Sequence, residues 1–216
     1  MIVGDFGTSY CKFADLSENP AAYRIIASKE LPAGLQVDIA TGHNGKRYAG
    51  QYVNELVALA RAGEALITEK NYVLLDCGSR DIKYIVFGDN RVLDMGWNTE
   101  CGASMGFTIE LLEKYYDLDY KKMTAPANTF SITCGVLGMS HIFDAVISGL
   151  PVTEAVARFV KGIALNAYRF AGSPEKIYLS GGLCDNPVFV GSFPCEVIPL
   201  GRFALLKGLQ YMRAQL

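Results

Sequence analysis

The segments DFGTSYCK at residues 5–12 and DCGSRDIK at residues 76–83 repeat one pattern in identical register. Both begin with an aspartate, continue to a glycine and a hydroxyl residue, and end with a lysine. Each follows an apolar stretch and precedes another, which predicts a strand, a tight turn and a second strand. We interpret the pair as the mark of two related halves, residues 1–70 with the first turn and residues 71–216 with the second.

The composition of both turns suits phosphate. Glycine lets a ligand approach the backbone closely, the hydroxyl adds a donor, and converging N–H groups form an anion-binding concavity. A carboxylate would repel phosphate, so we expect Asp5 and Asp76 to act through Mg²⁺ or by orienting an attacking water. The residues expected on phosphate are Gly7, Thr8 and Ser9 in the first turn, and Gly78 and Ser79 in the second. Ordinary hairpin turns share this composition, so it is the matched pair that favours a nucleotide.

A third glycine turn follows a short apolar run at residues 176–180. Paired glycines let the backbone lie flat against a base or ribose, so Gly181 and Gly182 are the expected adenosine contacts. Gly-Gly also marks many ordinary turns. Its place after two candidate phosphate turns is what favours a role in nucleotide binding.

The remaining sequence alternates strand and helix patterns. Residues 152–169 have the clearest helical period, with apolar residues on one face and charged residues on the other. Other expected elements are strands at 23–31, 72–87 and 92–97, a loop at 33–50, and helices at 51–66, 102–116, 135–148 and 201–212. This order predicts an α/β fold in which helices cover mixed sheets.

Composition excludes several classes of function. The net charge is −2 and the sequence has no cluster of Lys and Arg, which argues against a nucleic-acid partner. No signal-peptide pattern and no apolar run of about 20 residues is present, so we expect a cytoplasmic protein without a membrane partner. The six cysteines are then expected to be buried, to bind metal or to take part in redox chemistry rather than to form disulfides.

Five segments together resemble one family, the activators of 2-hydroxyacyl-CoA dehydratases and benzoyl-CoA reductases, in the actin, sugar kinase and Hsp70 ATPase superfamily. They are TG at 41–42 with a later glycine, LDCGSRDIK at 75–83, NTECGASMG at 98–106, TCGV at 133–136 and LSGGLCDN at 179–186. The resemblance covers nearly the whole chain. It implies an actin-like, ribonuclease H-like fold of two duplicated halves, and ATP or ADP with Mg²⁺ as ligands.

The resemblance also implies a redox role. Such activators are homodimers that share one [4Fe–4S] cluster, to which each subunit gives two cysteines, here matching Cys101 and Cys134. ATP hydrolysis changes the angle between helices at the cluster, and an electron passes to a partner dehydratase or reductase. Both cysteines precede predicted helices, whose N-termini favour anions and thiolates. Two ligands per chain leave a four-cysteine site incomplete, which a two-fold axis would complete.

Several residues stay outside these sites. Cys11, Cys77, Cys184 and Cys195 are interpreted as core residues, and His43 and His141 as surface or packing residues. Lys12 and Lys83 could reach phosphate, but solvation is the commoner state of such lysines. Trp97 is interpreted as a packing residue.

The sequence departs from the family at Ser79-Arg80, where a Gly-Gln pair is usual, and after Cys134, where acidic residues are usual. These departures leave hydrolysis and the partner open. The alternatives are a small-molecule kinase with Asp76 or Asp81 as base, a nucleotide-binding scaffold or filament protein, and a homologue that binds no nucleotide.

Overall fold

The computed structural model describes residues 1–98, 105–135 and 137–214. Contacts group the chain into two units. The first comprises residues 1–71, 87–95 and 203–216, and the second comprises residues 72–86 and 96–202. The expected division at residues 70 and 71 concerns duplicated halves rather than contact groups, and it stays a prediction.

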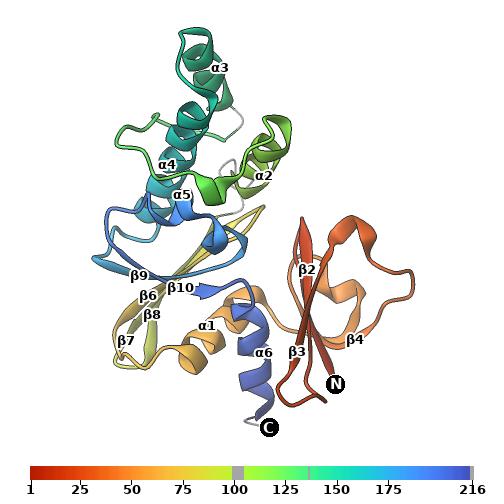
Figure 1. The fold of residues 1–216 in the computed structure, drawn as a ribbon. Helices are drawn as coiled ribbons and strands as arrows, with labels where there is room; N and C mark the ends of the chain where they lie inside the picture. The colour runs from red at the N-terminus through yellow and green to blue at the C-terminus, as the bar shows by residue number, and fades with distance from the viewer. Residues whose placement is uncertain (99–104, 136, 215–216) are drawn as a thin grey trace. The chain divides into compact units, whose positions relative to one another are not determined.

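The first unit contains a mixed five-stranded sheet in the order β3-β2-β1-β4-β5 (Figure 1). Its strands are β1 (Ile2–Phe6), β2 (Tyr10–Asp15), β3 (Ala22–Ala27), β4 (Val37–Thr41) and β5 (Ala49–Tyr52). β1 pairs antiparallel with β2 and parallel with β4. One face carries a core of Phe6, Phe13 and Ala40, with the ring of Tyr48 stacked on Phe6 at 4.4 Å.

A second five-stranded sheet has the order β10-β9-β6-β7-β8. Its strands are β6 (Tyr72–Cys77), β7 (Ile82–Gly88), β8 (Arg91–Asn98), β9 (Lys176–Ser180) and β10 (Glu196–Gly201). When its strands are counted from β8, their order along the chain repeats that of the first sheet. The end of β7 and the start of β8, residues 87–95, group with the first unit.

Helices complete each unit. The α-helices are α1 (Glu55–Leu66), α2 (Met105–Tyr115), α3 (Met139–Ile147), α4 (Val152–Phe170), α5 (Pro187–Val190) and α6 (Ala204–Ala214). Short 3₁₀ turns are η1 (Ser28–Glu30), η2 (Gly45–Arg47), η3 (Tyr120–Lys122) and η4 (Gly182–Asp185). In the first unit α1 packs closely on α6, since a Cβ added at Gly208 would lie 2.0 Å from the carbonyl oxygen of Ala58.

The second unit has its core around α4. The apolar face predicted from the sequence is buried there and includes Phe159, Val160 and Ile163. The expected strands, turns and helices are confirmed in type for the described residues, with ends shifted by a few positions. The first residues of the helix expected from residue 102 lie outside the described residues, and α2 is described from Met105.

The expected loop at residues 33–50 is wrong, because β4, η2 and the start of β5 lie within it. The exposed Asp38 interrupts the apolar residues of β4, which lie in a stretch rich in glycine and polar residues, so the strand does not stand out in the sequence. β10 is an additional strand that the sequence pattern does not predict, since Pro199 and Gly201 interrupt it.

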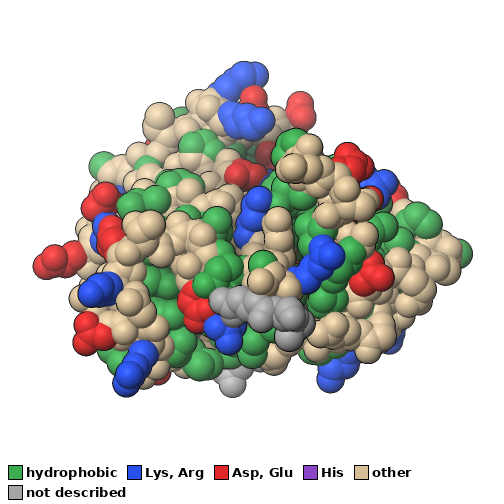
Figure 2. All heavy atoms as spheres, turned by 90° about the horizontal axis from the view of Figure 1, so that it is seen from below, with side chains coloured by type: hydrophobic (Ala, Val, Ile, Leu, Met, Phe, Trp, Pro, Cys, Tyr) green, Lys and Arg blue, Asp and Glu red, His purple; other side chains and the backbone are tan. Residues whose placement is uncertain are grey.

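The surface has no dominant charge on the face drawn in Figure 2, where Lys, Arg, Asp and Glu side chains are scattered among hydrophobic and other residues. Among the helices that the structure describes, none combines the length and the apolar character that crossing a membrane requires.

Candidate functional site

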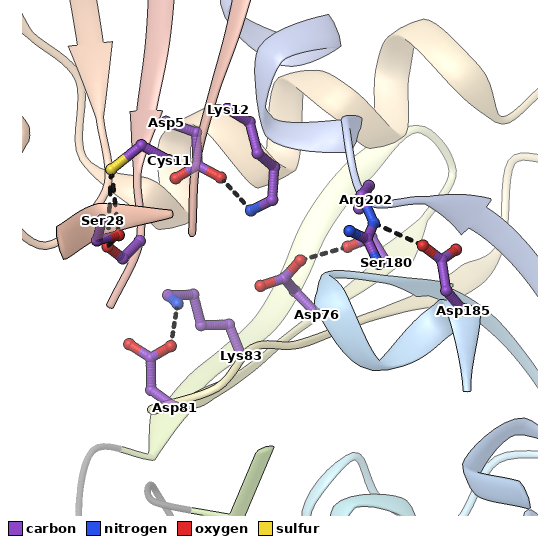
Figure 3. A network of polar contacts seen from close by, with 11 residues as sticks. Asp5, Cys11, Lys12, Ser28, Asp76, Asp81, Lys83, Ser180, Asp185 and Arg202 are labelled. Carbon is purple, nitrogen blue, oxygen red and sulfur yellow. Dashed lines mark hydrogen bonds and ion pairs between the residues drawn. The ribbon is translucent and has the colours of Figure 1, made fainter. Parts of the chain in front are cut away.

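The first turn connects β1 to β2. Asp5, next to the end of β1, is 3% exposed, and Oδ2 accepts a hydrogen bond from Nζ of Lys12 at 2.7 Å (Figure 3). The two residues are register partners on antiparallel strands, which places both side chains on one face of the sheet. The expectation of a solvated Lys12 is therefore wrong, because Asp5 holds its ammonium in a mostly buried ion pair.

Ser28 fixes the shape of the first turn from the neighbouring strand edge. Its hydroxyl donates to the carbonyl oxygen of Gly7 at 2.9 Å, and its backbone N–H donates to the carbonyl oxygen of Ser9 at 2.9 Å. The sulfur of Cys11 lies 3.3 Å from the same hydroxyl. Two carbonyl oxygens of the turn are thus held from the side of β3.

Two hydroxyls of the first unit are buried without a hydrogen-bond partner in the part of the chain that the structure describes. They are Oγ of Ser9, in the first turn, and Oγ1 of Thr41, at the end of β4. Such a hydroxyl costs about 1–3 kcal/mol unless a ligand or water satisfies it. The Asp5 carboxylate, with the Thr41 hydroxyl on the neighbouring strand as its register partner, offers oxygen donors of the kind that suit Mg²⁺ and its bound waters, so these two residues fit the ion. Thr8, also expected on phosphate, is exposed.

The second turn connects β6 to β7 and differs in its pairing. Asp76 is 5% exposed, and Oδ1 accepts from the hydroxyl of Ser180 at 2.6 Å (Figure 3). The backbone N–H of Gly78 donates to the carbonyl oxygen of Asp81 at 3.1 Å, which closes the turn.

Lys83 is only 1% exposed, and its Nζ lies 2.7 Å from Oδ1 of Asp81. Trp97 donates its indole N–H to Oδ2 of the same carboxylate at 2.7 Å, and its ring lies 5.0 Å from Nζ. The expectation of a solvated Lys83 is therefore also wrong. Trp97 has a polar partner in addition to its packing, and no local signal in the sequence predicts that contact.

The start of α2 lies against the second turn. The N–H of Phe107 donates to the carbonyl oxygen of Ser79 at 2.8 Å. A Cβ at Gly106 would lie 2.3 Å from the carbonyl oxygen of Gly78, so only glycine allows this approach. α2 therefore fixes both residues that the sequence assigns to phosphate in this turn.

The glycine turn after β9 begins with Gly181 at a φ of +91°. A Cβ there would lie 2.3 Å from the carbonyl oxygen of Cys77, whereas a Cβ at Gly182 would meet nothing within 4 Å. Gly181 is thus required by the close contact with β6. Gly182 is open, and the contact with adenosine predicted for both glycines stays a prediction.

The cysteines predicted to bind a cluster are only partly described. Cys101 lies outside the described residues. Cys134 is buried, and its carbonyl oxygen accepts from the N–H of Gly138 at 2.8 Å, in a turn before α3. A thiol at this place has the ligand chemistry that an iron–sulfur cluster needs. Over residues 1–98, 105–135 and 137–214 there is no group of three or more His, Cys, Asp or Glu side chains that could hold a metal ion.

The other cysteines are core residues or lie against the core. Cys11, Cys77 and Cys184 are buried, and Cys195 is partly buried beside the core of the second unit. Burial raises the pKa of the Cys77 thiol well above its usual range, and burial with the nearby charge of Asp185 raises the pKa of Cys184 to about 12. Both histidines are exposed, as expected.

Ser28 contacts the first turn, and Thr41 is the register partner of Asp5. The sequence pattern does not assign either residue to the predicted site. Ser28 gives no signal, because it begins η1, directly after β3, and its bonds to the first turn come from this other segment. Thr41 belongs to one of the segments that carry the family resemblance, and that is its only signal.

Solved structures show the same fold. One is the activator of the 2-hydroxyisocaproyl-CoA dehydratase from Clostridium difficile, solved with bound ADPNP. It is 18% identical to this chain, with a TM-score of 0.76, and the match covers 100% of this chain and 96% of the activator. The (R)-2-hydroxyglutaryl-CoA dehydratase component A of Acidaminococcus fermentans is 16% identical to this chain, with a TM-score of 0.78. The match covers 100% of this chain and 99% of that protein.

A putative 2-dehydro-3-deoxygalactonokinase from Sinorhizobium meliloti is also similar, with 15% identity and a TM-score of 0.57. The match covers 99% of this chain and 98% of that protein. The actin-like α/β fold and the structural resemblance to dehydratase activators are thereby confirmed. No protein-family model matches the chain, and no curated protein sequence matches it.

Proposed function

We propose that this protein is an ATP-dependent activator that donates a low-potential electron to a 2-hydroxyacyl-CoA dehydratase or a related reductase. The observation that carries the proposal is the likeness, over the full chain, to two proteins named as a dehydratase activator and a dehydratase component, one of them solved with bound ADPNP. At 16% and 18% identity this likeness establishes only the fold. Support for the function therefore also has to come from the residues of the site.

The two turns support nucleotide binding. In each, an aspartate at a strand end is nearly buried and held by a named partner, Lys12 for Asp5 and Ser180 for Asp76. Buried carboxylates held in place are what magnesium-assisted phosphate chemistry requires. In the proposal Gly7, Thr8, Ser9, Gly78 and Ser79 contact phosphate, and Gly181 and Gly182 contact adenosine.

Hydrolysis is assigned to Asp5 and Asp76. Asp81 is a poor base, because its two oxygens already accept from Lys83 and Trp97. Ser180 holds Oδ1 of Asp76 and limits the rotation of this carboxylate, which in the proposal acts on a magnesium-bound or attacking water. Arg80, which departs from the family pattern, is exposed and therefore does not block the turn from within.

Exposed apolar side chains support a dimer. Phe107, Leu111 and Tyr115 recur every four residues along α2, which places them on one stripe. On α3, Phe143 and Ile147 do the same, and Ile147 is 85% exposed. Apolar stripes of this kind mark interaction surfaces. We propose that these helices meet their copies in a homodimer whose Cys101 and Cys134 residues hold one [4Fe–4S] cluster.

A cluster held there would supply one electron to the partner enzyme, and a low-potential donor would restore it. Anaerobic purification should give a brown dimer with about four irons per two chains. Cys101→Ala and Cys134→Ala should each lose that iron and keep nucleotide affinity, while Cys195→Ala should keep both. Equal iron in the parent and in Cys101→Ala would rule out the cluster.

A small-molecule kinase is the second candidate, favoured by the likeness to the putative sugar-acid kinase. It predicts a colourless protein that transfers phosphate from ATP to a sugar or sugar acid. Transfer of labelled phosphate to a panel of such acceptors, lost in Asp76→Asn, would favour it. A scaffold or filament protein would instead show nucleotide-dependent sedimentation with slow turnover.

A further inference from the structure

Thr41 is completely buried, with an exposed fraction of 0%, and its Oγ1 has no hydrogen-bond partner among the described residues. Burying a hydroxyl without a partner costs free energy that a valine of the same shape would not cost. The contacts among the described residues therefore give no reason for a threonine here. The hydroxyl is expected to gain a partner in another state of the protein.

Thr41 lies directly beside Asp5. β1 and β4 are parallel neighbours, and Asp5 and Thr41 are register partners, just as Asp5 and Lys12 are on the other side. Register partners project from the same face of a sheet, opposite to the face that carries Phe6. Lys12, Asp5 and Thr41 thus form a row across β2, β1 and β4.

The backbone after Thr41 is held against β1. Gly42 has a φ of +90°, and a Cβ there would lie 2.4 Å from the backbone nitrogen of Phe6. The N–H of Asn44 then donates to the carbonyl oxygen of Phe6 at 3.4 Å. The backbone at the end of β4 is therefore fixed next to Asp5, and this limits where the Thr41 hydroxyl can lie.

We propose that Thr41 is a positioning residue whose hydroxyl hydrogen-bonds the Asp5 carboxylate when that carboxylate engages the hydrated magnesium ion of a bound nucleotide. This inference rests on the proposed function of the first turn. Without nucleotide, Lys12 holds Oδ2 of Asp5 at 2.7 Å. A carboxylate that turns from Lys12 toward a hydrated cation needs a second group to fix its orientation, and the Thr41 hydroxyl is adjacent and unsatisfied among the described residues.

The test measures the magnesium dependence of ADP binding by thermal unfolding of the full chain, with MgCl₂ titrated at fixed ADP and with EDTA as the zero point. In Thr41→Val the Tm without nucleotide should stay unchanged or rise by about 2–4 °C, because the orphan hydroxyl is gone. The MgCl₂ concentration that gives half of the ADP-induced rise in Tm should increase about tenfold. Any shift caused by ADP in EDTA should be the same as in the parent.

Two further variants separate positioning from packing. Thr41→Ser keeps the hydroxyl and should restore the parental magnesium profile. Ser192→Ala removes a buried hydroxyl that donates to the carbonyl oxygen of Val188 at 2.6 Å, so it should lower the Tm and leave the magnesium profile unchanged.

The inference is overturned if Thr41→Val binds magnesium-ADP with the parental profile, and in that case the proposed function stands. It is also overturned if Thr41→Val and Thr41→Ser both lose stability without nucleotide, since that would show a packing role. Absence of any magnesium-ADP shift in the parent would remove the proposed function itself.

Discussion

The hydroxyl of Ser180 donates a hydrogen bond to Oδ1 of Asp76 over 2.6 Å. The two residues are register partners near the ends of the parallel strands β6 and β9, and both are buried. The bond joins the turn between β6 and β7 to the glycine turn that follows Ser180. Two segments that the sequence presents as separate motifs are therefore one structural unit.

Ser180→Ala should lower the free energy of unfolding by about 1–3 kcal/mol, because the buried Asp76 carboxylate loses a donor. Urea unfolding checks this. Ser148→Ala removes an exposed hydroxyl that donates to the carbonyl oxygen of Asp144 at 2.8 Å, and it should change stability by no more than about 0.5 kcal/mol. Equal effects of the two substitutions would contradict a special role for the Ser180 bond.

The two adjacent glycines should respond differently to alanine. At Gly181 the φ of +91° opposes a side chain, and a Cβ added there would lie 2.3 Å from the carbonyl oxygen of Cys77. Gly181→Ala should therefore lower the Tm strongly in the absence of ligand. Gly182→Ala meets open space and should leave that Tm unchanged.

Gly182→Ala is then the clean measure of the proposed adenosine contact. If the base or ribose lies on this turn, the variant should bind ATP less tightly than the parent by isothermal titration calorimetry. Unchanged affinity would place the adenosine elsewhere.

Asp81→Ala should destabilise the second unit by about 3–5 kcal/mol, because it removes a partner of the buried Lys83 ammonium. Trp97 is the only tryptophan in the sequence, and its indole N–H would lose the same acceptor, so its fluorescence should change as well. Urea unfolding followed by this fluorescence measures both effects. Glu64→Ala breaks the surface ion pair with Arg61 and should lower the free energy of unfolding by only about 0–1 kcal/mol. If Asp81→Ala cost no more than Glu64→Ala, the buried pair would not have the expected weight.

Alkaline pH should destabilise the protein through buried thiols. Burial raises the pKa of Cys184 to about 12, whereas the thiol of an unfolded chain has a pKa of about 8.5. The native state keeps this proton while the unfolded state releases it. Stability present below a pH of about 8.5 is therefore lost as the pH rises toward about 12, by up to about 1.4 kcal/mol per pH unit.

Cys184→Ala should make the decline in the free energy of unfolding less steep between a pH of about 9 and about 11. Cys195, which is only partly buried, provides the matched variant, and Cys195→Ala should change the slope less. Identical slopes in the parent and in Cys184→Ala would show that this thiol does not titrate as expected.

Much of the fold follows from local patterns. The apolar period of α4 and the paired strand–turn–strand segments are confirmed, because burial of one helix face and hydrogen bonding of short strands act over neighbouring residues. β4 could not be predicted in this way, since Asp38 interrupts its apolar residues and the stretch around it is rich in glycine and polar residues.

The sequence by itself determined the repeated strand–turn–strand segments, because a glycine in a tight turn and the apolar runs on either side of it act through the local backbone. Only the tertiary structure decided which distant groups lie beside the aspartates of these segments. Lys12 pairs with Asp5, whereas Lys83 pairs with Asp81, an aspartate that the second segment carries where the first has Tyr10. The hydroxyl that donates to Asp76 comes from Ser180, and the indole N–H that donates to Asp81 comes from Trp97. These two groups stand on other strands, and no local pattern records which strand will lie beside which.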